Sequence, residues 1–280
     1  MFVLDTWHNS GAAPYASLSD QEYNEFIPAT FLTEGIDQTR GWAYTLLIEN
    51  VIMQNSSISP YQGFLFQGHI LDEKGNKMSK RLGNIVEGYK TLNENSVDLL
   101  RFYLMRKADP AKSLNFSFEE MSARPYQVIS TLFNLHKYLK QNGDYDNFDK
   151  EKHTLDWAIN QKLLSSPDYW ILSKLQNLIS DITDMFIDAN FDVVTKLIDD
   201  FTIESFSQIY LPMVRNEIWN DDESQLNRRL SIYSIIYHIL YHLNILLHPI
   251  SPFITEYLSL IHISEPTRPR LISYAVFCLK

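Results

Sequence analysis

The chain has 280 residues, enough for one large domain or two medium ones that each bury a hydrophobic core. Its formal net charge of −10 excludes a protein that coats nucleic acid through overall charge, so contact with RNA needs a local basic patch. Its single cysteine, Cys278, excludes a disulfide framework and a cysteine metal site within these residues. No segment has the pattern of a signal peptide or a membrane span, so we expect a cytoplasmic protein without membrane contact.

Strand and helix patterns alternate in the first 70 residues. A β-branched and aromatic run at 29–33 ends at Gly35, a helical pattern covers about 38–55, and residues 63–66 form a second strand pattern. A strand, a helix and a strand within so short a segment predict two parallel strands joined by a right-handed crossover. Ligands bind beyond the carboxyl ends of such strands, so residues after both strands are expected to meet at one crevice.

From about residue 84 the pattern is helical. We expect a helix over 96–105, a capping box at Ser117 and Glu120, and a break or kink near Pro125. An acidic loop over 141–152 separates this part from later segments whose apolar residues recur at helical spacing, which predicts a helix bundle. The three apolar faces are expected at Ile171, Leu175, Leu178, Ile182 and Phe186; at Val194, Leu197, Ile198 and Phe201; and at Leu226, Leu230, Tyr233, Tyr237 and Leu240.

Two segments near the carboxyl end need separate interpretation. Residues 232–247 are apolar but interrupted by polar side chains, which favours a buried core helix over a membrane span. Residues 259–280 contain two prolines and no amphipathic period, and they resemble translated sequencing-adapter read-through. We therefore expect a non-native tail there, with a genuine irregular tail as the alternative.

A basic loop between Gly75 and Gly83 is the clearest candidate binding element. Five basic residues and one acid, Glu87, occupy positions 74–90 of this acidic chain. Ammonium groups on a flexible loop suit the phosphates of a nucleotide, although an isolated basic cluster is more often a solvated turn.

The loop does not occur alone. Residues 77–81 read KMSKR, residues 34–42 read EGIDQTRGW, and residues 4–7 read LDTW. Together, in this order and spacing, they resemble the class I aminoacyl-tRNA synthetases, with the isoleucyl form of the motif at 34–42 and a variant of the KMSKS signature at 77–81. The resemblance covers about residues 2–258.

The resemblance implies an α/β region, the second half of a Rossmann-like nucleotide-binding fold with parallel strands, followed by an all-α helix bundle. The expected domains are 1–124, the catalytic half with its stem-contact region, and 125–258, part of the anticodon-binding domain. The HIGH half and the editing insertion of the family are not found, and residues 68–70 (GHI) are not the HIGH motif.

The resemblance also assigns roles in the basic loop. Lys80 is implied to be the principal contact to the ATP phosphates and Lys77 the second, which makes both the expected catalytic residues. Ser79 and the glycines let the loop close, and Met78 anchors it by packing. We also expect Gly68 and His69, which follow the second strand, among the nucleotide-binding residues.

Around the first strand end, Glu34 is implied to bind the adenylate through its ribose hydroxyls, and Gly35 allows close backbone approach. Asp37 and Gln38 match positions near the aminoacyl group, with a plain helix cap as the alternative for Asp37. Trp7 and Trp42 match the aromatic walls of the amino-acid pocket, with ordinary core tryptophans as the alternative.

The implied reaction is ATP-dependent activation of isoleucine to isoleucyl-adenylate, followed by transfer to tRNA(Ile). The expected ligands are isoleucine, tRNA(Ile) and ATP with Mg²⁺; no zinc site is expected in these residues, and the intact enzyme is expected to be a monomer. A valyl or leucyl relative and a non-catalytic tRNA-binding module remain as alternatives. Because the HIGH half is missing, we expect the chain alone to be inactive.

Overall fold

The computed structural model describes residues 6–54, 58–107, 109 and 112–261. These form two compact units: Met1–Ile85 with Ala108–Phe116, and Val86–Lys107 with Ser117–Lys280. The second unit thus begins at Val86, well before the expected domain boundary at residue 124.

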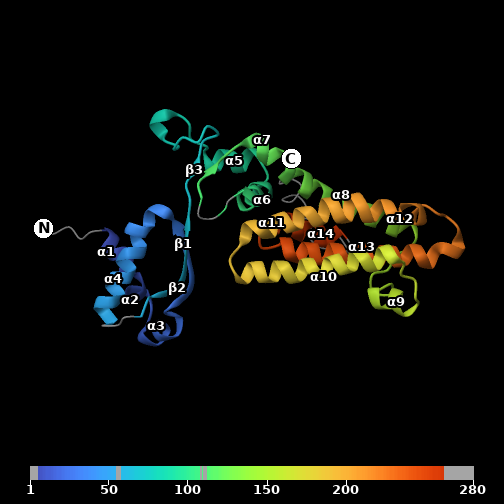
Figure 1. The fold of residues 1–280 in the computed structure, drawn as a ribbon, viewed down its shortest axis with the longest axis horizontal. Coiled ribbons are helices and arrows are strands. Elements are labelled where there is room, and N and C mark those ends of the chain that lie inside the picture. The colour runs from blue at the N-terminus through green and yellow to red at the C-terminus, as the bar shows by residue number, and fades with distance from the viewer. Residues whose placement is uncertain (1–5, 55–57, 108, 110–111, 262–280) are drawn as a thin grey trace. The chain divides into compact units, whose positions relative to one another are not determined.

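The first unit contains a two-stranded parallel sheet (Figure 1). Its elements are α1 (Thr6–Gly11), α2 (Ala13–Ser17), α3 (Asp20–Phe26), β1 (Ala29–Gly35), the 3₁₀ helix η1 (Ile36–Arg40), α4 (Trp42–Gln54), β2 (Tyr61–Gln67), β3 (Ile70–Leu71), the 3₁₀ helix η2 (Lys80–Leu82) and β4 (Leu114–Asn115). Strand β1 pairs with β2 in parallel from Ala29 opposite Tyr61 to Gly35 opposite Gln67, and β3 pairs with β4. The predicted strand–helix–strand unit is therefore confirmed.

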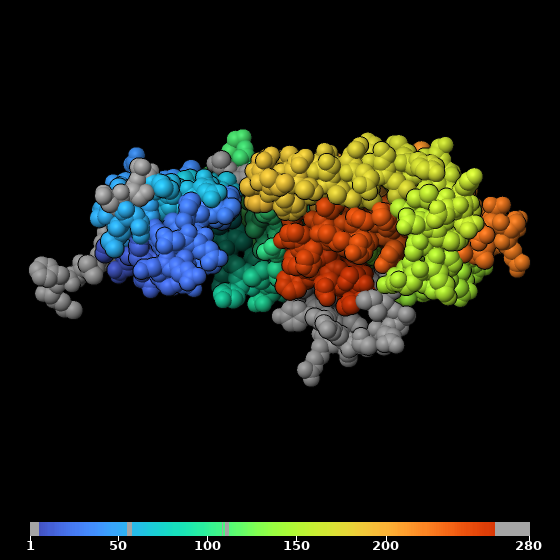
Figure 2. All heavy atoms as spheres, turned by 90° about the horizontal axis from the view of Figure 1, so that it is seen from below, coloured from blue at the N-terminus to red at the C-terminus, as the bar shows by residue number. Residues whose placement is uncertain are grey.

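The second unit is helical. Its elements are α5 (Gly88–Glu94), α6 (Val97–Lys107), α7 (Phe118–Ser122), α8 (Arg124–Tyr145), α9 (Leu155–Asn160), α10 (Ser166–Ile187), α11 (Phe191–Asp200), the π helix η3 (Phe201–Tyr210), α12 (Leu211–Ile218), the 3₁₀ helix η4 (Glu223–Gln225), α13 (Leu226–Leu247) and α14 (Pro252–Ile261). Figure 2 shows part of α13 and α14, in red, between the yellow residues of α10 and α11 and the yellow-green residues around α9.

Helix α6 belongs to this unit because it is bonded to the corner between α13 and α14. The Asp98 carboxylate accepts the Ile254 N–H at 2.5 Å, and Arg101 donates to the carbonyls of Pro249 and Ile250 at 3.0 and 2.7 Å. These bonds satisfy orphan backbone groups at the helix ends. They explain why residues 86–107 join the helical unit.

Helix boundaries in the bundle differ in part from the predicted ones. Ser117 accepts the Glu120 N–H as a cap, but of the short α7, while Pro125 lies in the first turn of a separate helix, α8. The loop expected to begin at 141 begins only after Tyr145, because Gly143 is buried in the last turn of α8. Helix α14 extends to Ile261 and so includes the first three residues of the expected tail, and the rest of that tail lies outside the described residues.

Helix α13 lies in the core of the bundle. The segment Glu223–Leu247 could cross a membrane by length and composition alone, but 67% of its most apolar window is buried inside the protein. The predicted buried core helix at 232–247 is confirmed.

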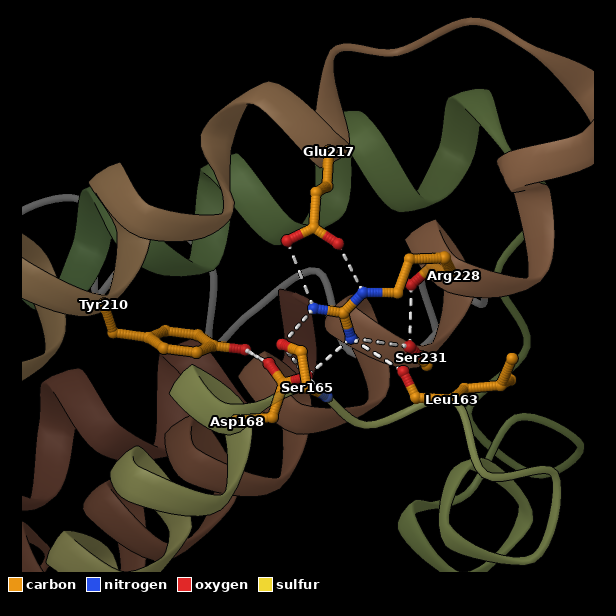
Figure 3. Close-up of polar contacts among 7 residues, drawn as sticks. All are labelled: Leu163, Ser165, Asp168, Tyr210, Glu217, Arg228 and Ser231. Carbon is orange, nitrogen blue, oxygen red and sulfur yellow. Dashed lines mark hydrogen bonds and ion pairs between the residues drawn. The ribbon is translucent and has the colours of Figure 1, made fainter.

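A polar cluster around Arg228 joins three helices inside this bundle (Figure 3). The Arg228 guanidinium donates to Asp168 on α10 at 2.6 Å and to Glu217 on α12 at 2.5 Å. The Tyr210 hydroxyl donates to the other Asp168 oxygen at 2.8 Å. Because Asp168 and Tyr210 are fully buried, each of their polar atoms needs such a partner.

Candidate active site

The carboxyl ends of β1 and β2 lie side by side. Gly35 lies opposite Gln67, and the Gln67 side-chain amide donates to the Thr33 hydroxyl at 3.0 Å. The side chains of Glu34 and of His69, which follows β2, are exposed. The residues after the two strands therefore meet at one edge of the sheet, as the parallel topology predicted.

Gln38, not Asp37, caps helix α4. The Gln38 side chain accepts the Trp42 N–H at 3.3 Å and donates to the Asp37 carboxylate at 3.0 Å. The helix begins at Trp42, after a separate turn of 3₁₀ helix, so the interpretation of Asp37 as its cap is wrong. Asp37 stays exposed, and its carboxylate lies so near Gly35 that an added Cβ there would come within 2.7 Å.

The two candidate tryptophans lie near Gly41. A Cβ at Gly41 would come within 2.9 Å of the Trp7 ring, so the tip of this ring lies directly against the Gly41 backbone. The Trp42 indole N–H donates to the Ser10 carbonyl at 2.9 Å, and its ring packs edge-on against Phe64. Trp7 is 43% exposed, which rules out an ordinary core position for it. Its role in a substrate pocket stays a prediction.

Gly68 and His69 have structural roles of their own. A Cβ at Gly68 would lie 2.1 Å from the Lys112 carbonyl oxygen, so only glycine fits beside that backbone. The His69 carbonyl accepts the Leu114 N–H at 2.8 Å, next to the pairing of β3 with β4. Their predicted nucleotide contact is not tested by this geometry.

The basic loop follows β3 and is the teal segment beyond that strand in Figure 1. Lys77, Lys80 and Arg81 are exposed, and no ion pair within the described part of the chain engages them. Met78 and Ser79 are half-buried, and the Ser79 hydroxyl accepts the Leu82 N–H at 3.2 Å. The loop therefore holds three unneutralised cations on an ordered backbone.

Two residues that the sequence did not single out hold this loop. Asn84 bonds to both Asp72 and the backbone of Ser79, each at 2.9 Å. The bond from Asn84, followed by the bonds from Asn76 and Lys74, lowers the pKa of the Asp72 carboxyl. The Asp-x-x-Gly turn at 72–75 and the Gly83-Asn84 dipeptide are turn signals that could have identified both residues.

The predicted site residues form two groups, one at the end of β1 and one in the basic loop. Glu34, Gly35, Asp37 and Gln38 share one strand end. Among the residues that the structure describes, no hydrogen bond or ion pair joins them to the basic loop, which belongs to the same compact unit. Nor does any group of three His, Cys, Asp or Glu residues in the described segments form a candidate metal site.

Two family models match the chain. The model described as tRNA synthetases class I (I, L, M and V) matches residues 2–117, the segment with both motifs. The model described as the anticodon-binding domain of tRNA ligase matches residues 168–271, which reaches into the expected tail. Residues 2–117 therefore carry a class I tRNA synthetase domain, and residues 168–271 carry an anticodon-binding domain of a tRNA ligase.

Similar proteins agree with these two matches. The isoleucine–tRNA ligase of Methanopyrus kandleri is 30% identical over 96% of the chain, that of Porphyromonas gingivalis 32% over 91%, and that of Thermoplasma volcanium 34% over 92%. The chain spans 22–26% of the length of these curated relatives.

Solved structures of synthetases have the same fold. A ternary complex of LeuRS, tRNA and LeuAMS from Agrobacterium radiobacter matches with a TM-score of 0.72 at 18% identity, over 93% of this chain and 31% of that one. Methionyl-tRNA synthetase of Mycobacterium tuberculosis with methionyl-adenylate matches with a TM-score of 0.71 at 16% identity, over 94% of this chain and 50% of that one. The expected fold class, a Rossmann-like core followed by a helical region, is confirmed.

Proposed function

We propose that this chain is part of an isoleucine–tRNA ligase and that its basic loop binds the phosphates of ATP. The observation that carries the proposal is the loop itself, in which Lys77, Lys80 and Arg81 extend into solvent without an acidic partner. Unpaired cations in a protein of net charge −10 are available to an anionic ligand. The matched relatives named isoleucine–tRNA ligase support isoleucine over valine or leucine as the amino acid.

The proposed chemistry needs no protein nucleophile. An oxygen of the isoleucine carboxylate attacks the α-phosphorus of ATP, the bond to the bridging oxygen breaks, and pyrophosphate leaves with the bonding electrons. Negative charge grows on the leaving group, and Lys80 with Lys77 stabilises it electrostatically. Mg²⁺ enters with ATP as part of the substrate.

The strand-end residues have positioning roles in this proposal. Glu34, exposed at the end of β1, accepts the ribose hydroxyls, and Asp37 and Gln38 lie near the aminoacyl group. Trp7 and Trp42 form apolar walls around the isoleucine side chain. The second product, isoleucyl-tRNA, forms when the terminal ribose of tRNA(Ile) displaces AMP from the adenylate.

The helical unit is proposed to bind tRNA(Ile), since residues 168–271 match the anticodon-binding model. We further propose that the intact protein is a cytoplasmic monomer. A stand-alone tRNA-binding module is the competing function, because binding by the bundle does not require the loop.

The test uses the full-length protein obtained by extending the reading frame around this chain. The proposal is supported if isoleucine promotes the exchange of pyrophosphate into ATP and valine or leucine promotes it far less efficiently. If valine or leucine promotes the exchange best, the protein is instead part of a valyl- or leucyl-tRNA synthetase. Binding of tRNA without exchange for any amino acid supports the non-catalytic module.

A further inference from the structure

Asp72 and Asn84 lie on either side of the basic loop and bond to each other across its base. We propose that they are positioning residues that hold the loop backbone in the geometry needed for adenylate formation. This inference rests on the proposed function of the loop. The loop has so far been described through its basic side chains. The inference adds two residues that support the loop and do not contact substrate.

The Asn84 side chain uses both of its ends. Its Oδ1 atom accepts the Ser79 N–H at 2.9 Å, while its Nδ2 atom donates to the Asp72 carboxylate at 2.9 Å and to the Lys77 carbonyl at 3.3 Å. This is the one amide orientation that gives every partner a complementary donor or acceptor. One side chain thus joins the start, the middle and the end of the loop.

The Asp72 carboxylate fixes the turn that leads into the loop. Its Oδ1 atom accepts the backbone N–H groups of Lys74 and Asn76 at 3.0 and 2.7 Å. Gly75 has a φ of +80°, a conformation that glycine adopts without strain. The lowered pKa of Asp72 agrees with a carboxylate that stays ionised and accepts these bonds at neutral pH.

The clasp formed by Asp72 and Asn84 orders the backbone and leaves the cations free. It contacts the Lys77 carbonyl and the Ser79 N–H, but neither member forms an ion pair with the Lys77 or Lys80 ammonium group. Helix η2 begins at Lys80, directly after the bonded Ser79. The clasp therefore sets the point from which Lys80 extends, and a displacement of about 1 Å of such a group can lower a rate roughly 100-fold.

The experiment compares variants of the full-length protein in pyrophosphate exchange. Asn84→Ala and Asp72→Asn are each expected to lower kcat by about 10- to 100-fold, with the KM for isoleucine and the melting midpoint nearly unchanged. Glu73→Gln is the matched control, because it removes the same charge from an exposed neighbour in the same turn. It is expected to behave like wild type.

A reciprocal exchange provides the readout that a purely structural role would not give. In the double variant Asp72→Asn with Asn84→Asp, an amide at position 72 can donate to a carboxylate at position 84. The second oxygen of that carboxylate can still accept the Ser79 N–H. The double variant is expected to recover at least ten-fold in kcat over Asn84→Asp alone, in which two carboxylates face each other.

The outcomes separate this inference from the proposed function. Absence of isoleucine-dependent exchange in the wild-type protein overturns the proposed function. Exchange in wild type that falls with Lys80→Ala but not with Asn84→Ala or Asp72→Asn overturns the clasp alone. A double variant no better than Asn84→Asp, or a loss that matches a fall in melting midpoint, likewise overturns the positioning role.

Discussion

Arg228 on α13 and Asp168 on α10 form a buried ion pair, with Nη1 and Oδ2 2.6 Å apart (Figure 3). The same arginine also donates to Glu217 on α12 at 2.5 Å, to Ser165 at 2.9 Å, to the Leu163 carbonyl at 3.1 Å and, within α13 itself, to Ser231 at 3.2 Å. A charge so enclosed is stabilised only while its partners remain.

Removal of Arg228 is expected to destabilise the bundle strongly. Arg228→Met leaves the Asp168 carboxylate buried without its cation, which costs roughly 3–5 kcal/mol of unfolding free energy. Arg215→Met is the control, since Arg215 is exposed on the neighbouring helix α12 and stacks on Trp219. Urea unfolding followed by circular dichroism measures both, and equal losses would show that the buried pair has no special contribution.

Acid is expected to weaken the bundle through Asp146. Two bonds from Arg229, at 2.8 and 2.9 Å, and one from the Tyr233 hydroxyl, at 2.8 Å, hold the pKa of Asp146 below its ordinary 3.8, with Arg229 the main cause. As pH falls, the Asp146 carboxylate is therefore protonated in the unfolded chain before it is protonated in the folded one. The resulting stability is present above about pH 4 and is lost as pH falls through the ordinary value toward the lower folded one.

Asp146→Asn should remove that pH dependence. The variant is expected to lose roughly 3 kcal/mol at neutral pH and to show a shallower decline in stability between about pH 5 and pH 3. Asp144→Asn, at an exposed ion pair with Lys140, should leave the decline as in wild type. Urea unfolding midpoints measured across this pH range test the prediction. Parallel curves of midpoint against pH for Asp146→Asn and wild type would show that Asp146 does not cause the decline.

Lys80 and Arg81 are neighbouring exposed cations with different expected roles. In the full-length protein, Lys80→Ala should lower the activation rate by the equivalent of roughly 2–4 kcal/mol, because the charge on the leaving pyrophosphate grows in the transition state. The KM for isoleucine should change little. Stopped-flow or exchange kinetics test this, and an equal loss with Arg81→Ala would mean that the wrong cation has been assigned.

The 280-residue chain by itself is expected to be inactive in exchange. The 280 residues contain no HIGH motif, and among the described residues β1 and β2 pair only with each other. Unpaired strand edges invite further pairing, so a separately expressed upstream segment is the natural complement. Exchange above background with the purified chain alone would contradict this split-site argument.

The sequence predicted those parts of the fold that depend on periodicity. Strands at 29–33 and 63–66 and the buried faces led by Ile171, Val194 and Leu230 follow from side-chain pattern, and the structure has them. It could not predict where α4 begins, because that start depends on the Gln38 side chain replacing a conventional cap.

The π helix η3 and the clasp of Asp72 and Asn84 also could not be predicted from the spacing of apolar residues in the sequence. Pro212 follows η3 within one continuous helical segment and lacks the N–H that an ordinary turn requires, yet the sequence does not show how the preceding backbone adapts. Asp72 and Asn84 act through bonds across a loop, and such pairs have no repeating spacing. Family resemblance supplied Lys77 and Lys80 but not the residues that hold them.

The parallel sheet also bears on the order in which the chain folds. Ala29 must find Tyr61, and Ile70 must find Leu114, across long intervening segments, whereas α13 and α14 meet through a short corner. Residues distant in sequence can pair only after the loop between them has closed, which costs conformational entropy before the contact stabilises the fold. Such contacts therefore slow folding. During synthesis or refolding, helical signal should therefore accumulate before the sheet forms, and the strand ends that carry Glu34 and Gly35 would be assembled late.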